Sequence, residues 1–462
     1  MRYISTRGRA PALDFDDVLL TGLARDGGLY VPEHWPHIDA DMLRAMRGLS
    51  YAELTVRVLH PFMESIAEAD LGAMAEAAYA TFDDPDVAPL RQLDRGYLME
   101  LFHGPTLAFK DLAMQLLSRL FDHVLQRRGQ RVTIVGATSG DTGAAAIAAC
   151  RDRPAIDVFI LFPKGRVSSV QQRQMTTVTS ANVHAIAVDG NFDDCQALVK
   201  AMFNDHGFRD AINMTAVNSI NWARVAAQIV YFVRAAAELE AGRRPLSFCV
   251  PTGNFGCVFS GYAARAMGVP IERLIVATNR NDILHRFFQS GRYAVEGVVA
   301  TQSPSMDIQV ASNFERLLFD LAGRDGAATD ALMQNLSRSG HFSVPKEWMD
   351  KARACFASAR VDEDTTTRTI AEMEREAGLL IDPHTAVALR AAKEAGGGEN
   401  LVTLSTAHPA KFPEAVERAV GHRPPLPASL ADLFERPERM TELPNDLAVV
   451  QDFVRNHARP AA

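Results

Sequence analysis

VTIVGATSGDTGAAAIAAC, residues 132–150, joins a short apolar run, a glycine-rich turn and an alanine-rich segment without a break. The apolar run from Val132 to Val135 is typical of a buried strand. The turn from Gly136 to Gly143 leads directly into the helix-forming residues from Ala144 to Cys150. A strand, a turn and a helix in this order are typical of a mostly parallel sheet that helices cover.

The same alternation of short apolar runs and helical segments begins at about residue 95 and continues along most of the chain. Several of the runs are followed directly by turn residues and then by a helical pattern, which predicts an α/β fold. The predicted strands are Val132–Val135, Ile156–Phe162, Val183–Val188, Phe248–Val250, Leu274–Ala277 and Leu401–Leu404.

The length of 462 residues exceeds what one hydrophobic core usually holds, so we expect two or three domains. The first eighty or so residues read as helices and loops and end near the turn cluster Asp83–Asp86. The last forty residues are rich in proline around Pro424–Pro427. We therefore predict an N-terminal domain over residues 1–88, the main α/β region over 89–420, and a C-terminal tail over 421–462 that packs on the body.

Composition and charge narrow the classes of partner. The net charge of −8 argues against nucleic acids and anionic membranes, because both require a basic surface. No apolar run approaches the roughly 20 residues of a membrane-spanning helix, and the N-terminus lacks a signal-peptide pattern, which predicts a cytoplasmic protein. The five cysteines form no CxxC pair, so neither a disulfide framework nor a metal site is expected.

HGPTLAFKD, residues 103–111, places Lys110 among apolar neighbours close to the start of a predicted helix. A lysine amine is a nucleophile only without its proton, and apolar surroundings favour the neutral form. Phe109, Leu107 and Leu112 supply such surroundings. An isolated lysine at this position is usually a solvent-facing residue of the first helical turn, so the prediction of a catalytic Lys110 depends on the rest of the chain.

Two glycine-rich turns lie between a predicted strand and a predicted helix: Gly136–Gly143 and Pro251–Gly256. Free backbone N–H groups and the helix dipole at such a position favour an anion, although a single turn of this kind is more often only a turn. Neither turn carries GxGxxG or GKS/T, which argues against a dinucleotide and a nucleoside triphosphate. A reactive lysine with phosphate sites favours pyridoxal 5′-phosphate, without identifying a reaction.

Five motifs, in this order along the chain, resemble the threonine synthase family: HGPTLAFKD, GATSGDTG, NSINWAR (218–224), PTGNFG (251–256) and LSTAHPAKF (404–412). Thr6–Gly8 and DGGLYVP (26–32) resemble the N-terminal domain of the longer, bacterial and fungal branch of that family. The resemblance covers nearly the whole chain. It implies fold type II of the pyridoxal-phosphate enzymes, with two α/β lobes of mostly parallel open sheets flanked by helices and a mainly helical N-terminal domain.

The resemblance also implies a role for each residue that matches a motif. Lys110 is expected to hold the cofactor as a Schiff base and then to move protons, and Thr406 is expected to meet the pyridine nitrogen. The cofactor phosphate is expected to lie on the turn formed by Gly253, Asn254, Phe255, Gly256 and Cys257. Asp141 stands at the position where many relatives in the wider fold family carry an asparagine beside the ring oxygen of the cofactor, and the resemblance implies that Asp141 lies there.

The substrate that the resemblance implies is O-phospho-L-homoserine, which water converts to L-threonine and phosphate. Its phosphate requires a second anion site, and the residues carried over to it are Thr138, Ser139, Thr142, Ser219 and Arg224. Arg224 is the natural bidentate partner of a phosphate. The expected partner is this small molecule alone, and the chain is expected to act as a monomer or homodimer.

Three alternatives remain open from the sequence. A threonine-synthase-like phospholyase, which releases 2-oxobutyrate, would use the same motifs. A serine or threonine dehydratase resembles the chain less at the N-terminus and needs no second phosphate site. A non-catalytic protein of the same fold, which only binds a ligand or partner, has no chemical need for Lys110 or Thr406.

Overall fold

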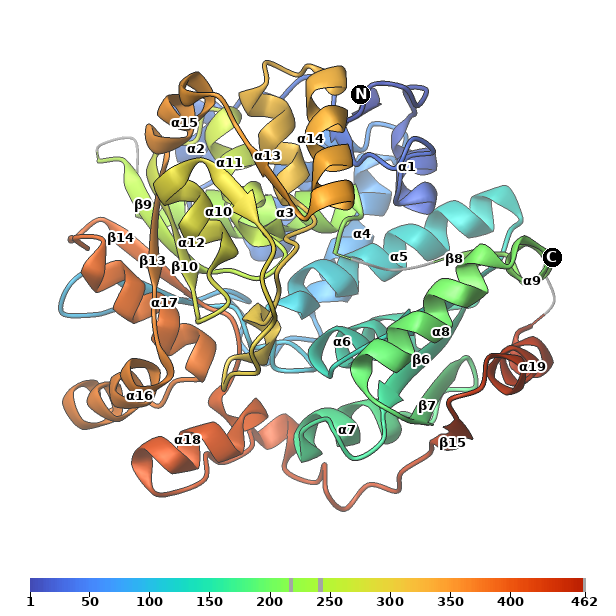
Figure 1. Cartoon of the computed structure of the whole chain (residues 1–462). Helices are drawn as coiled ribbons and strands as arrows, with labels where there is room; N and C mark the ends of the chain where they lie inside the picture. Colours follow the sequence, from blue (N-terminus) through green and yellow to red (C-terminus); the bar gives the residue numbers. More distant parts are fainter. Residues whose placement is uncertain (216–218, 240–243, 460–462) are drawn as a thin grey trace. The chain divides into compact units, whose positions relative to one another are not determined.

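A computed structural model describes residues 1–215, 219–239 and 244–459, which fall into two compact units. Unit 1 comprises the described residues of Met1–Ala75, Asp84–His103 and Ser219–Pro424, and unit 2 those of Glu76–Asp83, Gly104–Asn218 and Pro425–Ala462. Each unit contains a mostly parallel sheet with helices packed on it (Figure 1), so the predicted α/β class is confirmed. The domain boundaries after residues 88 and 420 stay predictions, and residues 460–462 of the predicted tail lie outside the described part.

The sheet of unit 2 is parallel throughout, in the order β15-β7-β6-β5-β8. Its strands are β5 (Val132–Ala137), β6 (Ile156–Pro163), β7 (Val183–Asp189), β8 (Met214–Thr215) and β15 (Thr441–Pro444). Its helices are α5 (Lys110–Arg128), α6 (Asp141–Cys150), α7 (Ser169–Thr176), α8 (Phe192–Asn204), α9 (His206–Ala211), η4 (Ala428–Leu430) and α19 (Leu447–His457).

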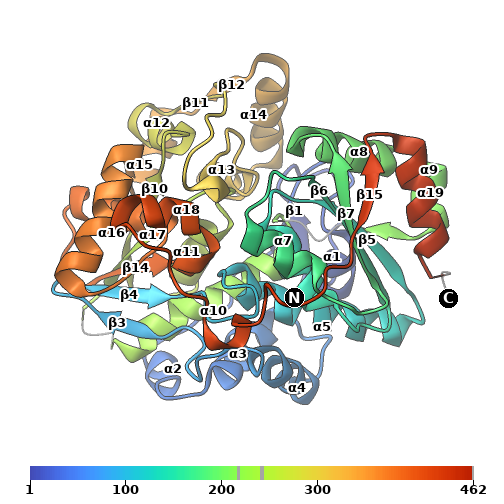
Figure 2. The ribbon, with the colours of Figure 1, turned by 90° about the horizontal axis from the view of Figure 1, so that it is seen from below.

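The C-terminal segment completes unit 2. β15 adds to the sheet beside β7, as the red strand in Figure 2 shows, and α19 follows it. Val450 and Val454 of α19 share a buried apolar cluster with Phe159 and Ile186 of the sheet and with Leu198 of α8. This cluster explains why a chain end whose sequence reads as a proline-rich tail is nevertheless ordered as a strand and a helix.

His184 lies on β7 where α19 packs. Its ring stacks on Phe159, with the ring centroids 4.4 Å apart, and the centroid of His457 lies 5.5 Å away. The buried Nε2 of His184 has no hydrogen-bond partner in the described part of the chain. Burial, with the nearby His457 and Arg439, lowers the pKa of His184 from 6.5 to about 4.

We expect His184 to weaken unit 2 in acid. The unfolded chain binds a proton at this histidine near its ordinary pKa and the folded chain only near pH 4, so the stability that it contributes falls as the pH drops from about 6.5 to 4. The variant His184→Phe keeps the ring stack and cannot be protonated. Between pH 7 and 4.5 its Tm should fall by about 1–3 °C less than that of the wild type. Equal acid sensitivity of the two proteins in thermal melts would contradict this expectation.

The main sheet of unit 1 has the order β13-β10-β9-β14-β4-β3 and is parallel except for the β3–β4 pair. Its strands are β3 (Leu90–Gln92), β4 (Tyr97–Glu100), β9 (Leu246–Pro251), β10 (Ile271–Thr278), β13 (Phe356–Arg360) and β14 (Leu401–Ser405). The remaining elements from residue 219 to 424 are α10 (Trp222–Glu238), α11 (Gly256–Ala266), α12 (Ile283–Ser290), β11 (Arg292–Ala294), η2 (Pro304–Met306), α13 (Phe314–Leu321), α14 (Gly326–Ser339), β12 (His341–Ser343), α15 (Lys346–Arg353), α16 (Glu363–Ala377), α17 (Pro383–Glu394), η3 (Pro409–Lys411) and α18 (Pro413–Val420).

The N-terminal region is mainly helical, as expected. Its elements are β1 (Tyr3–Ser5), α1 (Phe15–Thr21), β2 (Tyr30–Pro32), α2 (Ala40–Ala45), α3 (Tyr51–Leu59), η1 (His60–Phe62) and α4 (Glu68–Tyr79). Among the helices of the described residues, none combines the length and the apolar character needed to cross a bilayer.

All six predicted strands lie within observed ones, and their ends differ by at most a few residues. The prediction missed the short strands β3, β4, β8, β13 and β15 of the two main sheets and the two-stranded pairs β1–β2 and β11–β12. β13 and β15 lie at sheet edges and expose several of their side chains, so they lack the continuous apolar run that marks a buried strand.

Candidate functional site

In unit 2, Lys110 is the first residue of α5, and a tightly held loop leads to it. The backbone N–H of Thr106 donates to Oδ2 of Asp111 at 2.8 Å, and Thr106 Oγ1 donates to Oδ1 at 2.7 Å. A Cβ on Gly104 would lie 2.5 Å from Cβ of Asp111, so only glycine fits there. Leu107 enters a buried apolar cluster. The motif therefore forms a short loop that hydrogen bonds hold in place, and this loop puts Lys110 at the predicted start of the helix.

The Lys110 amine lies in an ion pair, which the sequence did not predict. Its Nζ is 3.2 Å from Oδ2 of Asp141, and its side chain is 11% exposed. The other carboxylate oxygen, Oδ1, accepts a hydrogen bond from Gln171 Nε2 at 2.8 Å. The ring of Phe109 is the expected apolar neighbour, with its centroid 5.9 Å from Nζ. Asp141 is thus adjacent to the predicted nucleophile, and Gln171 orients the Asp141 carboxylate.

The first glycine-rich turn, between β5 and α6, is organised by Thr138. Its buried Oγ1 accepts hydrogen bonds from the backbone N–H groups of Gly140 at 3.0 Å and Gly143 at 2.9 Å. The hydroxyl proton is donated to no described residue, so it is available to a ligand. Ser139 is exposed and Thr142 half-buried, and no side chain caps the start of α6. The turn therefore presents hydroxyl and backbone donors, as an anion site requires.

The second glycine-rich turn, in unit 1, connects β9 to α11. A Cβ on Gly253 would lie 2.4 Å from the carbonyl oxygen of Ser305, so the turn has no room for a side chain there. Phe255 precedes α11 with φ of +63°, and no side chain caps this helix. The thiol of the buried Cys257 contacts the Tyr231 hydroxyl at 2.8 Å. The uncapped helix start and the small residues suit a phosphate group, and the cofactor-phosphate role of this turn stays a prediction.

Arg224 is a buried cation of unit 1. It lies in the first turn of α10, is 5% exposed, and its Nη1 has no hydrogen-bond partner in the described residues. Burial lowers the pKa of its guanidinium to about 10, so the group remains charged at neutral pH. A buried charge without a partner is destabilising, which indicates a place for an anion.

Ser219, the other predicted substrate contact of unit 1, is half-buried just before α10. Its carbonyl oxygen accepts a hydrogen bond from Asn313 Nδ2 at 2.9 Å. Asn221 caps α10, with its Oδ1 3.0 Å from the Ala223 nitrogen, and its Nδ2 donates to the carbonyl oxygen of Leu19. Asn218 of the same motif lies outside the described residues.

Thr406 follows β14 directly and is buried. The preceding residue, Ser405, is fixed through its hydroxyl, which lies 2.9 Å from that of Thr385, and through its carbonyl, which accepts from the Leu101 nitrogen at 2.9 Å. The Thr406 hydroxyl bonds to no described residue, so it is free to meet a ring nitrogen. Both Thr406 and the Gly253 turn lie at carboxyl ends of parallel strands of one sheet, where ligands bind in α/β folds.

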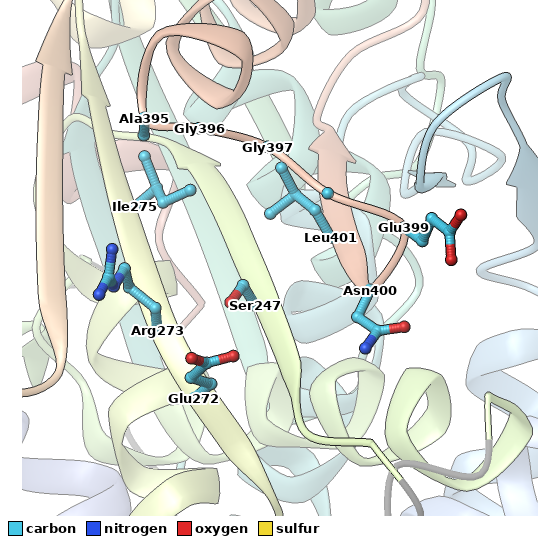
Figure 3. A pocket seen from close by; sticks show the side chains of 11 residues that line it. Ser247, Glu272, Arg273, Ile275, Ala395, Gly396, Gly397, Glu399, Asn400 and Leu401 are labelled. Atoms are coloured by element: carbon cyan, nitrogen blue, oxygen red, sulfur yellow. The ribbon is translucent and has the colours of Figure 1, made fainter.

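A surface pocket of unit 1 lies at the amino ends of the strands of the same sheet, on the side opposite to Thr406 and the Gly253 turn. It has a volume of about 420 Å³ and is lined by the start of β9 at Ser247, by Glu272 and Arg273 of β10, and by the loop Gly396–Leu401 (Figure 3). Ser247, Glu272 and Arg273 lie near the starts of their strands, whereas the Gly253–Cys257 turn follows β9 and Thr406 follows β14. The pocket is therefore separate from the predicted site. The described residues contain no cluster of His, Cys, Asp and Glu that could hold a metal ion.

Three family models match the chain. The model described as "Pyridoxal-phosphate dependent enzyme" matches residues 87–407, which is more than half of the chain. The model "Threonine synthase N terminus" matches residues 2–79, and the model "Threonine synthase, C-terminal" matches residues 385–454.

Individual relatives agree with these models over the full length. The threonine synthase of Pseudomonas aeruginosa is 57% identical, over 99% of this chain and 98% of its own. A crystal structure of threonine synthase from Brucella melitensis with bound PLP is 54% identical, with a TM-score of 0.98, and covers 99% of this chain and 100% of that one. The yeast threonine synthase structure is 39% identical, with a TM-score of 0.94, and covers 99% and 98%. The chain therefore belongs to the threonine synthase family of pyridoxal-phosphate-dependent enzymes.

Proposed function

We propose that this chain converts O-phospho-L-homoserine and water to L-threonine and inorganic phosphate, with pyridoxal 5′-phosphate as its cofactor. The observation that supports this most directly is Arg224, a buried guanidinium whose Nη1 has no partner within the described residues. A dianionic phosphate ester supplies the missing negative charge, and its oxygens accept two parallel hydrogen bonds from arginine. A substrate without a phosphate would leave this cation unpaired.

The cofactor roles follow the fit of the residues. When bound, pyridoxal phosphate accepts electron density from the amino acid's α-carbon, which makes the α-proton acidic. We assign the covalent attachment of its aldehyde carbon to Lys110, whose amine Asp141 holds at 3.2 Å. We assign its phosphate to the turn Gly253–Cys257 and its ring nitrogen to the hydroxyl of Thr406. A hydroxyl does not favour a protonated ring as a carboxylate would.

The substrate roles concern its phosphate. In unit 1 we assign Arg224 and Ser219 to the phosphate oxygens, and in unit 2 the donors Thr138, Ser139 and Thr142. These groups would stabilise the charge that grows on the phosphate as its bond to the γ-carbon breaks. Lys110 would remove the α-proton and later return a proton to the same carbon. The β-carbon loses a proton, phosphate leaves the γ-carbon, and the γ-carbon gains a proton to become a methyl group. The hydroxyl of water is added to the β-carbon, so one substrate and one water give one threonine and one phosphate.

The product identifies the reaction. We expect the protein loaded with cofactor to release threonine and phosphate in equal amounts from O-phospho-L-homoserine, as measured by NMR and a phosphate assay. Release of 2-oxobutyrate with phosphate would replace the proposal with a phospholyase. An absence of turnover, with cofactor bound, would indicate a different substrate or a non-catalytic protein.

The wider cellular setting stays a prediction. The sequence predicts a cytoplasmic protein that acts as a monomer or homodimer without nucleic acid or membrane partners. Light scattering of the purified protein with bound cofactor would measure its mass in solution directly.

A further inference from the structure

Asn313 lies immediately before α13, and its side chain is fully buried. Its Nδ2 donates to the carbonyl oxygen of Ser219 at 2.9 Å and to that of Asn254 at 3.0 Å. Its backbone N–H also donates to the Asn254 carbonyl at 3.1 Å. Ser219 and Asn254 are 94 and 59 residues away in the chain. One side chain thus joins the segment before α10 to the turn before α11.

The amide of Asn313 has only one favourable orientation. Nη1 of the buried Arg316 donates to Asn313 Oδ1, while Nε donates to the Tyr30 carbonyl at 3.0 Å and Nη2 to the Ile220 carbonyl at 2.6 Å. A guanidinium has no acceptor, so Oδ1 must face it and both N–H bonds of the amide point to carbonyl oxygens. Burial lowers the pKa of Arg316 to about 9, so it still donates at neutral pH.

We propose that Asn313 is a positioning residue of the active site, which sets the spacing between the substrate-phosphate segment at Ser219 and the cofactor-phosphate turn at Asn254. The inference rests on the proposed function for the role of Ser219. Neither segment belongs to a helix or strand, so no regular backbone ladder sets this spacing. Groups that bind two phosphates must be placed within a fraction of an ångström, because misplacement by about 1 Å can reduce the rate a hundredfold.

The variant Asn313→Asp tests the proposal with almost no change in size. It puts a carboxylate oxygen, an acceptor, against the two carbonyl oxygens that now receive N–H bonds, so both side-chain links are lost and only the backbone bond to Asn254 remains. We expect the half-saturating concentration of pyridoxal phosphate and the KM for O-phospho-L-homoserine each to rise at least about tenfold, equivalent to about 1.4 kcal/mol each. The change in kcat should be smaller than the change in KM.

Asn182→Asp is the matched control. Asn182 is a buried residue of unit 2 whose Nδ2 also donates to backbone carbonyls, those of Cys150 at 2.8 Å and Ile156 at 2.9 Å, with a longer contact to that of Arg153 at 3.5 Å. Its Oδ1 accepts from the Asp152 nitrogen, as that of Asn313 accepts from Arg316. We expect the control to lower Tm and to leave both affinities within twofold of the wild type.

The outcomes separate positioning from mere stabilisation. Equal losses of Tm in the two variants, with the affinities of Asn313→Asp within twofold of the wild type, would overturn the proposal. If Asn313→Asp yields no folded protein, Asn313→Ser, which keeps one donor, is judged by the same criteria, and its failure to fold would also overturn the proposal. If the wild type makes no threonine, the proposed function fails, while the cofactor titration still decides the link to Asn254.

Discussion

Replacement of Lys110 by alanine is expected to lower kcat by at least about 10³-fold and to abolish the visible absorbance of the covalently attached cofactor. The amine has two tasks in the proposed reaction, since it holds the cofactor aldehyde and carries the proton at the α-carbon. Lys110 is the first residue of α5, and its Nζ lies 3.2 Å from Oδ2 of Asp141. The loop before α5 therefore already fixes the position of the amine. Borohydride reduction followed by peptide mass analysis would locate the cofactor on Lys110.

Two further variants make this test specific. Lys110→Arg keeps the positive charge beside Asp141 but lacks a nucleophilic amine, so it should be as inactive as the alanine variant. Lys351→Ala removes an exposed lysine of α15 that pairs only with Glu347 among the described residues, and its activity should equal that of the wild type. Substantial activity of Lys110→Arg, or reduction that labels another lysine, would contradict the assigned role.

The fold was largely predictable because its strongest signals are local. A buried parallel strand is an uninterrupted apolar run, and a turn residue and a helix follow it, so β5, β6 and β9 are readable from a few consecutive residues. The grouping of segments into units was not predictable in the same way. Unit 1 comprises the described residues of 219–424 together with two segments of the first 103 residues. A local sequence pattern does not show which distant segments pack together.

The residues of the candidate site likewise differ in whether a local sequence pattern could predict them. Lys110 and the two glycine-rich turns stand out by residue type and local spacing, whereas Arg224 was expected only from the resemblance of its motif to the threonine synthase family. The Lys110–Asp141 pair joins residues 31 positions apart, and only the structure shows it. No local sequence pattern pointed to Asn313, because the role proposed for it depends on the two carbonyl groups that it contacts and not on its neighbours in the sequence.

Arg224 should affect stability and activity in opposite directions. In the variant Arg224→Met a neutral side chain of similar length replaces a buried cation whose Nη1 has no partner in the described residues, so the substrate-free protein should gain about 2–4 °C in Tm. The same variant should lose at least about 10²-fold in kcat/KM for O-phospho-L-homoserine. Two hydrogen bonds to a charged phosphate contribute about 1.5–3 kcal/mol each, which accounts for a loss of this size.

Two controls test whether the lost contact with the substrate phosphate causes these effects: added inorganic phosphate and a variant of a neighbouring arginine. With the cofactor bound, so that its phosphate fills the turn proposed for it, added phosphate should raise the Tm of the wild type in a concentration-dependent way and raise that of Arg224→Met much less. Arg234, on the same helix α10, donates to the Leu49 carbonyl at 2.6 Å and pairs with Glu238, so Arg234→Met should lower Tm and keep kcat/KM. A loss of Tm in Arg224→Met would contradict the argument, because it would mean that the folded protein without substrate already satisfies this charge. The opposite signs expected for the two variants of one helix follow from their partners. Arg234 is a paired cation that stabilises the fold, whereas Nη1 of Arg224 has no partner in the described residues, and the proposed function assigns this cation to the substrate phosphate.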